Sequence, residues 1–328
     1  MRVLVVGGAG YIGSVAVRYL KETGHEVCVF DNVSRGHAEA VPADTRLIVG
    51  DLASLDDLDR AFESGFDAVM HFAALSLVPE SMKNPAAYFK NNIAYGLNLL
   101  EAMRKHSVDK LIFSSTAAVY GEPPSSPITE DFPLQPSNPY GESKLAFEKI
   151  LKWYHTAFDF KYISLRYFNA AGAYGDAGED HLPETHLIPI VLQAAQGKRS
   201  EITIFGDDYK TPDGTCVRDY IHVRDLADAH VKALEALAAG HNSEVFNLGQ
   251  GTGSSVKEVI EAARKVTGKT ICASVTERRP GDPSTLVASN AKIGKQLGWS
   301  PRFSQIETII EDAWTWHQAH PFGYGKSS

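Results

Sequence analysis

Cysteine is scarce in this sequence of 328 residues, and long apolar runs are missing. The three cysteines, Cys28, Cys216 and Cys272, are too few and too widely spaced to indicate a disulfide framework or a zinc site. No apolar run reaches the roughly 18 residues that a membrane span needs. Glycines interrupt the apolar N-terminus, which favours a strand and a turn over a signal peptide. We therefore expect a protein of the reducing cytoplasm with no metal site and no membrane segment.

Basic clusters, internal repeats and low-complexity segments are also missing. The net charge is −8, and no cluster of lysine and arginine is long enough to indicate nucleic-acid binding. An anionic ligand would therefore need a local basic pocket. The composition, 44% hydrophobic and 22% charged, is ordinary for a globular protein, and the length fits one large domain or two medium ones.

Apolar, β-branched runs alternate with helical patterns in the first half of the chain. This alternation predicts an α/β fold with a doubly wound parallel sheet that is covered on both faces. The expected strands are 2–6, 26–30, 46–50, 68–74, 110–115 and 162–168, and the expected helices are 13–22, 54–63, 85–105 and 140–158.

Longer loops rich in glycine and proline follow residue 170. We therefore expect an N-terminal domain over 1–170 and a smaller α/β domain over 171–328. One segment, 221–249, again reads as a helix followed by a strand, and we expect it to join the first domain.

A glycine-rich loop follows the first expected strand. In VLVVGGAGYIGS, Gly7, Gly10 and Gly13 have the spacing G-x-x-G-x-x-G. Such glycines let the backbone approach a pyrophosphate, while the helix that follows offers its free N–H groups to the phosphates. The pattern indicates a dinucleotide site, although a purely structural turn would give the same spacing.

Acidic residues end the next two strands. Asp31 lies where a carboxylate accepts hydrogen bonds from an adenosine ribose and repels a 2′-phosphate. It favours NAD over NADP, whereas the nearby Arg35 argues for the opposite preference. Asp51 either meets the adenine or caps the helix of 54–63.

A tyrosine and a lysine lie four residues apart in NPYGESK. On a helix that begins at Pro139 they share a face, so the ammonium of Lys144 is expected to lower the pKa of Tyr140 and make it a base near neutral pH. The hydroxyl residues 114–116 end a parallel strand, at the edge where ligands bind. A surface pair on an amphipathic helix is the alternative interpretation.

These motifs together resemble those of the extended short-chain dehydrogenase/reductases. Within that family, similarity to the UDP-galactose 4-epimerases (UDP-glucose 4-epimerases) runs along nearly the whole chain, and the stretch YKTPDGTCVRDYIHV is the most specific. The resemblance implies a cytoplasmic isomerase of galactose and carbohydrate metabolism. It would interconvert UDP-galactose and UDP-glucose by NAD-dependent, transient oxidation at carbon 4 of the sugar. Residues 1–170 would form the NAD-binding Rossmann domain, 171–328 would bind the nucleotide sugar, and helices 85–105 and 140–158 would pair in a homodimer.

The resemblance also implies individual roles. Tyr140 is the acid and base, Lys144 lowers its pKa and holds the nicotinamide ribose, and Thr116 supplies the second hydroxyl. The implied NAD site contains Gly7, Gly10, Tyr11, Ile12, Gly13, Asp31, Asn32, Asp51, Leu52, Phe72, Ala73, Ala74, Asn91, Ser114, Tyr140, Lys144 and Tyr167. The implied nucleotide-sugar site contains Thr116, Tyr140, Asn169, His186, Leu187, Thr203, Phe205, Arg218, Arg279, Asp282 and Leu286, with both arginines facing the diphosphate.

Departures from the family pattern occur at Val15, Ser76 and His186. A dehydratase of the same group would carry an acidic pair directly after the threonine, where this chain has two alanines, 117 and 118. A decarboxylase or a non-catalytic NAD-binding regulator is a further alternative. Leu286 either restricts the sugar site to glucose and galactose or simply packs in the core.

Overall fold

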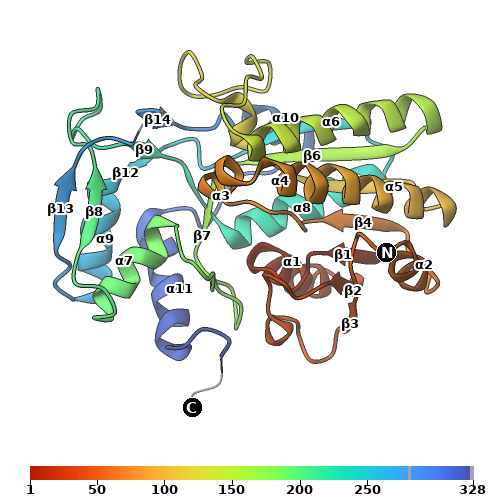
Figure 1. The fold of residues 1–328 in the computed structure, drawn as a ribbon, viewed down its shortest axis with the longest axis horizontal. Coiled ribbons are helices and arrows are strands. Elements are labelled where there is room, and N and C mark those ends of the chain that lie inside the picture. The colour runs from red at the N-terminus through yellow and green to blue at the C-terminus, as the bar shows by residue number, and fades with distance from the viewer. Residues whose placement is uncertain (280–281, 326–328) are drawn as a thin grey trace.

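The computed structural model describes residues 1–279 and 282–325. Within them, seven strands form one parallel sheet in the order β11-β6-β5-β4-β1-β2-β3 (Figure 1). The expected α/β class with a doubly wound parallel sheet is confirmed. The strands are β1 (Arg2–Val6), β2 (Glu26–Asp31), β3 (Arg46–Val49), β4 (Ala68–His71), β5 (Lys110–Thr116), β6 (Lys161–Tyr167) and β11 (Glu244–Leu248).

Helices cover both faces of this sheet. Helices α1 (Tyr11–Glu22) and α8 (Val223–Ala238) pack on one face, and α2 (Leu55–Phe62), α5 (Tyr95–Lys105) and α6 (Pro139–Phe158) pack on the other. Alternate residues of β1 belong to the two hydrophobic clusters that result. Burial on both faces is why the strands are almost continuously apolar.

The strand order reverses at β1, which lies between β2 and β4. From β1 the chain adds β2 and β3 in one direction and β4, β5 and β6 in the other. In open α/β sheets, ligands bind beyond the carboxyl ends of the strands at such a reversal. The glycine loop directly follows β1 at this point.

The segment 221–249 returns to the first sheet. Strand β11 pairs with β6 from Glu244 opposite Ile163 to Leu248 opposite Tyr167, and α8 shares a hydrophobic cluster with α1. The boundary at residue 170 and the functional division of the chain stay predictions.

The remaining C-terminal elements pack beside the main sheet. Their hydrophobic core lies between α7 (Leu187–Ala195), α9 (Val256–Thr267) and α11 (Ile306–Ala319). Short strands pair as β7 (Asn169–Ala171) with β10 (Tyr220–His222), β8 (Ile202–Phe205) with β13 (Ala273–Thr276), and β9 (Val217–Arg218) with both β12 (Ser254–Ser255) and β14 (Thr285–Leu286). None of the helices in the described ranges is both long and apolar enough to span a bilayer.

The expected helix over 85–105 is interrupted. It begins as α4 (Pro85–Phe89), passes through a π-helical turn at Lys90–Ala94 and continues as α5. Single π-turns occur frequently at functional sites. By contrast, α6 begins at Pro139 as expected, and the Asn138 side chain caps it by accepting the Gly141 N–H at 2.9 Å.

Candidate active site

A cavity of about 1090 Å³ lies at the carboxyl edge of the main sheet. Residues from the glycine loop, β5, α6 and the C-terminal elements all contribute to its lining. Most of the residues assigned from the sequence meet there: Gly7, Gly10, Tyr11, Ile12, Gly13, Asp31, Asn32, Asp51, Leu52, Phe72, Ala73, Ala74, Asn91, Thr116, Tyr140, Lys144, Tyr167, Asn169, His186, Arg218, Arg279, Asp282 and Leu286.

The glycine loop is packed too closely for side chains. Gly7 has φ +84°, and a Cβ there would lie 2.4 Å from the Ala73 nitrogen. A Cβ on Gly13 would lie 2.1 Å from the Gly7 carbonyl oxygen. Helix α1 starts directly after Gly10 without a side-chain cap or an acidic residue in its first turn, so its N–H groups can serve a phosphate. The loop therefore fits the pyrophosphate of a dinucleotide.

Asp31 is anchored beside this loop. Its carboxylate accepts the Ala9 N–H at 2.9 Å and the Val33 N–H at 2.8 Å, while burial raises its pKa. Arg35 donates instead to Glu80, at 2.8 Å. Because a carboxylate already pairs with Arg35, this arginine gives little support to a 2′-phosphate, and the site favours NAD over NADP.

The two interpretations of Asp51 are resolved by α2. The cap of this helix is Ser54, whose side chain accepts the Asp57 N–H at 3.2 Å, so the helix-cap interpretation of Asp51 is wrong. Asp51 instead lines the cavity and accepts a hydrogen bond from the Asn32 amide at 2.9 Å.

Tyr140 and Lys144 both face the cavity from α6. Lys144 is 4% exposed, and its Nζ donates to the Ser114 carbonyl at 2.8 Å. Burial raises the pKa of Tyr140, opposed by hydrogen bonding with the Thr116 hydroxyl, and burial lowers the pKa of Lys144 to about 7. The expected lowering of the Tyr140 pKa is therefore not found in this arrangement, because the desolvation of the phenol outweighs the other effects.

Ser114 does not line the cavity. Its hydroxyl lies 3.1 Å from Nε2 of His230, whose Nδ1 lies 2.8 Å from the Leu226 carbonyl. Because a carbonyl only accepts, Nδ1 carries the proton and Nε2 accepts from Ser114. Burial lowers the pKa of His230 to about 4, so this imidazole is neutral near pH 7. Ser114 therefore contributes its carbonyl to Lys144 rather than a hydroxyl to the cavity.

A buried ion pair below the cavity was not predicted from the sequence. Glu148 lies one helical turn after Lys144, and its Oε2 lies 2.6 Å from a guanidinium nitrogen of Arg166. The Ser115 hydroxyl donates to Glu148 at 2.5 Å, and Arg166 also donates to the Tyr120 oxygen at 2.8 Å. An arginine inside the apolar run YISLRYF was the available signal, since a charge there needs a buried partner.

The predicted basic pocket lies on the opposite wall. Arg218 and Asp282 form an ion pair at 2.5 Å, and the Arg279 guanidinium lies 3.8 Å from the centre of the Phe205 ring. Phe205 thus supports Arg279 without lining the cavity. Pro280 and Gly281 of the RRPGD motif lie outside the described residues.

Two further predicted residues are also absent from the lining. Thr203 lies on the exposed side of β8, and Leu187 begins α7 and packs against the C-terminal core. Leu286, in β14, lines the cavity and also packs against the hydrophobic cluster of Val119 and Tyr120. Its position is compatible with both interpretations, and its role as a gate stays a prediction.

His186 belongs to a cluster that the sequence reading did not find. Its Nδ1 lies 2.8 Å from Oε1 of Glu179 and 3.0 Å from Oε1 of Glu184, and His181 Nδ1 lies 3.2 Å from the same Glu179 oxygen. Burial disfavours charge on both imidazoles, but the carboxylates outweigh it, so the pKa of His181 rises to about 9 and that of His186 rises well above its ordinary value. The signal was the alternation of glutamate and histidine in GEDHLPETH.

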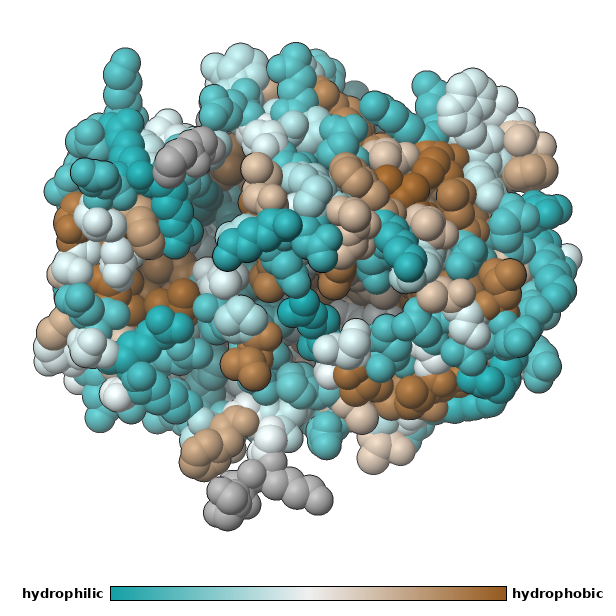
Figure 2. All heavy atoms as spheres, in the orientation of Figure 1, coloured by the Kyte–Doolittle hydropathy of each residue, from teal (hydrophilic) through white to brown (hydrophobic). Residues whose placement is uncertain are grey.

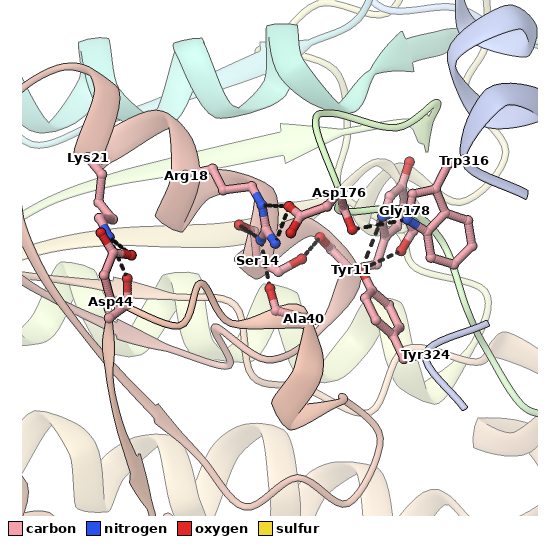
Figure 3. Close-up of polar contacts among 11 residues, drawn as sticks. Tyr11, Ser14, Arg18, Lys21, Ala40, Asp44, Asp176, Gly178, Trp316 and Tyr324 are labelled. Atoms are coloured by element: carbon pink, nitrogen blue, oxygen red, sulfur yellow. Dashed lines mark hydrogen bonds and ion pairs between the residues drawn. The ribbon is translucent and has the colours of Figure 1, made fainter. Parts of the chain in front are cut away.

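Helix α1 is joined to the segment that leads to this cluster (Figure 3). Arg18 donates to Asp176 at 2.5 Å, and Trp316 of α11 donates to the Asp176 carbonyl at 3.1 Å. The Gly178 N–H donates to the Tyr324 hydroxyl oxygen at 3.1 Å. The segment is thus held by helix α1 on one side and by helix α11 and the residues that follow it on the other.

Comparisons with known proteins agree with this geometry. The model of the "NAD dependent epimerase/dehydratase family" matches residues 3–249. A UDP-glucose 4-epimerase of Lacticaseibacillus casei is 52% identical over 328 residues, which cover 99% of each chain. A crystal structure of a UDP-glucose 4-epimerase superposes with a TM-score of 0.97 at 52% identity, covering 99% of this chain and 100% of the other. The enzyme of Brucella ovis in complex with NAD gives 0.94 at 43% identity, covering 98% of both chains. This chain therefore belongs to the NAD dependent epimerase/dehydratase family and, within it, to the group of the UDP-glucose 4-epimerases.

Proposed function

We propose that this chain is an isomerase that interconverts UDP-glucose and UDP-galactose through transient, NAD-dependent oxidation at carbon 4 of the sugar. One observation carries the proposal. Tyr140 and Thr116 line the same cavity as the dinucleotide loop on one side and the arginines 218 and 279 on the other. One cavity thus combines residues suited to bind a dinucleotide, a proton acceptor and residues suited to bind a diphosphate.

NAD would be held by the glycine loop and the α1 N-terminus at its pyrophosphate, by Asp31 at the adenosine ribose, and by Lys144 at the nicotinamide ribose. When bound, it accepts a hydride from carbon 4 and returns it. The family comparison and the close-packed loop both support this cofactor. The proton transfer and the positioning of the sugar depend on side chains of the protein itself.

Tyr140 is the proposed proton acceptor. Its phenolate would take the proton of the 4′-hydroxyl, and the phenol formed in this way would give the proton back to the same oxygen after the configuration has changed. Thr116, which lines the same cavity, would hold that oxygen during the transfer. Positioned acid and base catalysis of this kind contributes about 10²–10⁴ in rate.

Inversion requires that the oxidised sugar turn over before it is reduced. Arg218 and Arg279 would clamp the diphosphate, so the nucleotide stays fixed while the sugar rotates. The cavity of about 1090 Å³ provides room for that rotation. Because two alanines, and not an acidic pair, directly follow Thr116 in the sequence, elimination of water is not the favoured outcome.

The test is incubation of the purified protein with UDP-galactose without added NAD, followed by separation of the products. Formation of UDP-glucose until the two sugars reach equilibrium is expected. A 4-keto-6-deoxy product would instead identify a dehydratase. No conversion of any UDP-sugar, even with NAD supplied, would identify a non-catalytic NAD-binding regulator.

Association into a homodimer is part of the proposal. Hydrophobic residues gather on the face formed by α5 and α6 (Figure 2). Trp153 is 69% exposed, Phe158 53% and Phe89 39%. Large exposed apolar side chains on the neighbouring helices α4 and α6 support a subunit contact. Light scattering should give twice the chain mass for the parent and the chain mass for Trp153→Glu.

A cytoplasmic location is also proposed. Cys28 and Cys216 are buried free thiols, and Cys272 is an exposed one. Free thiols of this kind fit a reducing compartment. Cell fractionation with an antibody against the chain would test the location.

A further inference from the structure

We propose that Glu179, His181, Glu184 and His186 bind a zinc ion in the wall of the cavity. The cysteine count excluded a thiolate zinc site, but it does not bear on a site built from imidazoles and carboxylates. The inference concerns metal binding only and does not depend on the reaction proposed above.

The four ligand atoms have the spacing of a metal site. They all lie within 4.8 Å of one another. The four distances between an imidazole Nδ1 and a carboxylate oxygen are 2.8, 3.0, 3.2 and 3.8 Å. Zinc bonds of about 2.0–2.2 Å place tetrahedral ligand atoms roughly 3.3–3.6 Å apart. The observed separations bracket that range, so small side-chain movements suffice for coordination.

Burial and charge point to a cation at this place. The side chains of Glu179 and Glu184 are only 5% and 4% exposed. Within the described chain, their ion-pair partners are the two histidines and neither a lysine nor an arginine. Two buried carboxylates side by side are costly without compensating positive charge. In the metal-free site the two histidines supply it as imidazolium ions. A zinc ion would displace both imidazole protons and place the same two positive charges at one point.

His181 gives a second observation. Its Nδ1 atom is buried and forms no hydrogen bond, although the Glu179 oxygen lies only 3.2 Å away. A buried nitrogen seldom lacks a partner. The contact with Glu179 is thus an ion pair without hydrogen-bond geometry, and a metal ion at the shared centre would replace this misaligned contact.

The segment that carries the ligands is preorganised. Glu184 accepts the N–H groups of Thr185 and His186, both at 2.7 Å, and the Asp180 carboxylate accepts the Tyr324 N–H at 2.9 Å. His181 also packs edge-on against Tyr11, with ring centres 6.2 Å apart. Four protein ligands would close the coordination sphere, which is typical of a structural zinc site.

The consequence would be a fixed junction between α1 and α7. His186 precedes the first residue of α7, and Tyr11 is the first residue of α1. Coordination through Nδ1 would leave Nε2 of His186, a residue of the cavity lining, to meet a phosphate oxygen. The ion would thus set the position of one side chain in the substrate cavity without touching the reacting carbon.

The test uses the untagged, full-length protein with no variant needed. Elemental analysis after growth in zinc-supplemented medium should give about one zinc per chain. Cobalt exchanged into the site should give the intense visible absorption of a tetrahedral Co²⁺ ion. Less than a tenth of an equivalent of zinc, together with no competition against a chromophoric chelator, overturns the proposal.

Two variants locate the ion. Glu179→Gln keeps the shape of the side chain but removes one charged ligand, and His181→Ala removes another. Both should lose at least tenfold in zinc affinity and lose the cobalt absorption, whereas the half-buried control His241→Ala, outside the cluster, should keep both. Circular dichroism confirms that the variants are folded. Bound zinc that survives both substitutions overturns the assignment, because the metal would then lie elsewhere.

Discussion

Lys144 donates a buried hydrogen bond of 2.8 Å to the backbone carbonyl of Ser114. The bond joins α6 to the carboxyl end of β5, two residues before Thr116. The lysine thus fixes the spacing between the strand that carries one hydroxyl and the helix that carries the other. Because the acceptor is a main-chain atom, side-chain substitution at Ser114 does not remove it.

Replacement of Tyr140 by phenylalanine tests the proposed proton acceptor. The variant should lose about 10²–10⁴-fold in kcat, because it lacks the hydroxyl whose deprotonated form takes the proton. UDP binding, measured by calorimetry, should change by less than about threefold, since the arginines and not the phenol hold the diphosphate.

Tyr154→Phe is the matched control for that variant. Tyr154 lies on the same helix, but its hydroxyl donates to Glu101 at 2.7 Å away from the cavity lining. Turnover of this control should equal that of the parent. Near-normal turnover in Tyr140→Phe would remove Tyr140 from the mechanism.

Glu148→Gln should destabilise the folded protein. It leaves the Arg166 guanidinium buried without its counter-charge, which typically costs about 3–5 kcal/mol. Urea unfolding measures the loss. The control Glu261→Gln breaks an exposed pair with Arg264 on α9 and should cost less than about 1 kcal/mol. An equal decrease in the free energy of unfolding in the two variants would show that burial does not make the Glu148–Arg166 pair more important for stability than an exposed pair.

Stability should fall as the pH drops from about 6.5 toward 4, and His230 should contribute to the fall. Its pKa is lowered to about 4 in the folded state, against an ordinary value of 6.5, so within this range the unfolded chain binds a proton that the folded chain does not. The free energy of unfolding then decreases with falling pH, by at most about 1.4 kcal/mol per pH unit for one histidine.

His230→Gln tests this contribution. The glutamine amide can accept from Ser114 and donate to the Leu226 carbonyl, but it does not titrate. Urea unfolding between pH 4 and 7 should show a shallower slope of the unfolding free energy against pH than in the parent, and His241→Gln, at a half-buried histidine, is the control. An unchanged slope in His230→Gln would assign the pH dependence to other groups.

Cofactor choice should depend on Asp31. Equilibrium titration of cofactor-depleted protein should show NAD binding at least tenfold tighter than NADP. Asp31→Asn keeps an acceptor for the Ala9 N–H but removes the charge that repels a 2′-phosphate. The ratio of the NADP dissociation constant to the NAD dissociation constant should therefore be smaller in the variant than in the parent. A parent that prefers NADP would mean that Arg35 dominates despite its pairing with Glu80.

Leu286 should influence the accepted sugars. An acetamido group at carbon 2 has to fit against this side chain, and a clash in a packed site costs about 1–3 kcal/mol, roughly tenfold to hundredfold in rate. Leu286→Gly should raise kcat/KM for UDP-N-acetylglucosamine relative to UDP-glucose. The ratio of the two substrates is its own control for a general loss of activity. A flat ratio, or equal use of both sugars by the parent, would show that Leu286 is not the gate.

Much of the fold could be read from the sequence because it depends on local patterns. Each of these patterns predicts only the local structure of its own segment. Examples are the apolar runs of the main sheet, the glycine loop and the proline at the start of α6. The π-helical turn at Lys90–Ala94 could not be read in this way. The stretch around it keeps an ordinary helical pattern.

The chemistry of the site was harder to predict than its location. The pKa of Tyr140 depends on its burial by segments that are far apart in the chain, and a four-residue spacing does not reveal that burial. The same is true of Glu148 and Arg166, which meet across α6 and β6. His186 was assigned from a motif, but its three partners become visible only once the loop is folded.

The order of strands also sets the timing of synthesis. Strand β6 ends at residue 167, but its outer neighbour β11 begins only at residue 244. At about 5–20 residues per second, the ribosome needs roughly 4–15 seconds to make the intervening chain. During that interval the apolar edge of β6 has no partner, and unpaired edges promote association between chains. We therefore expect the nascent protein to be most prone to association midway through its translation.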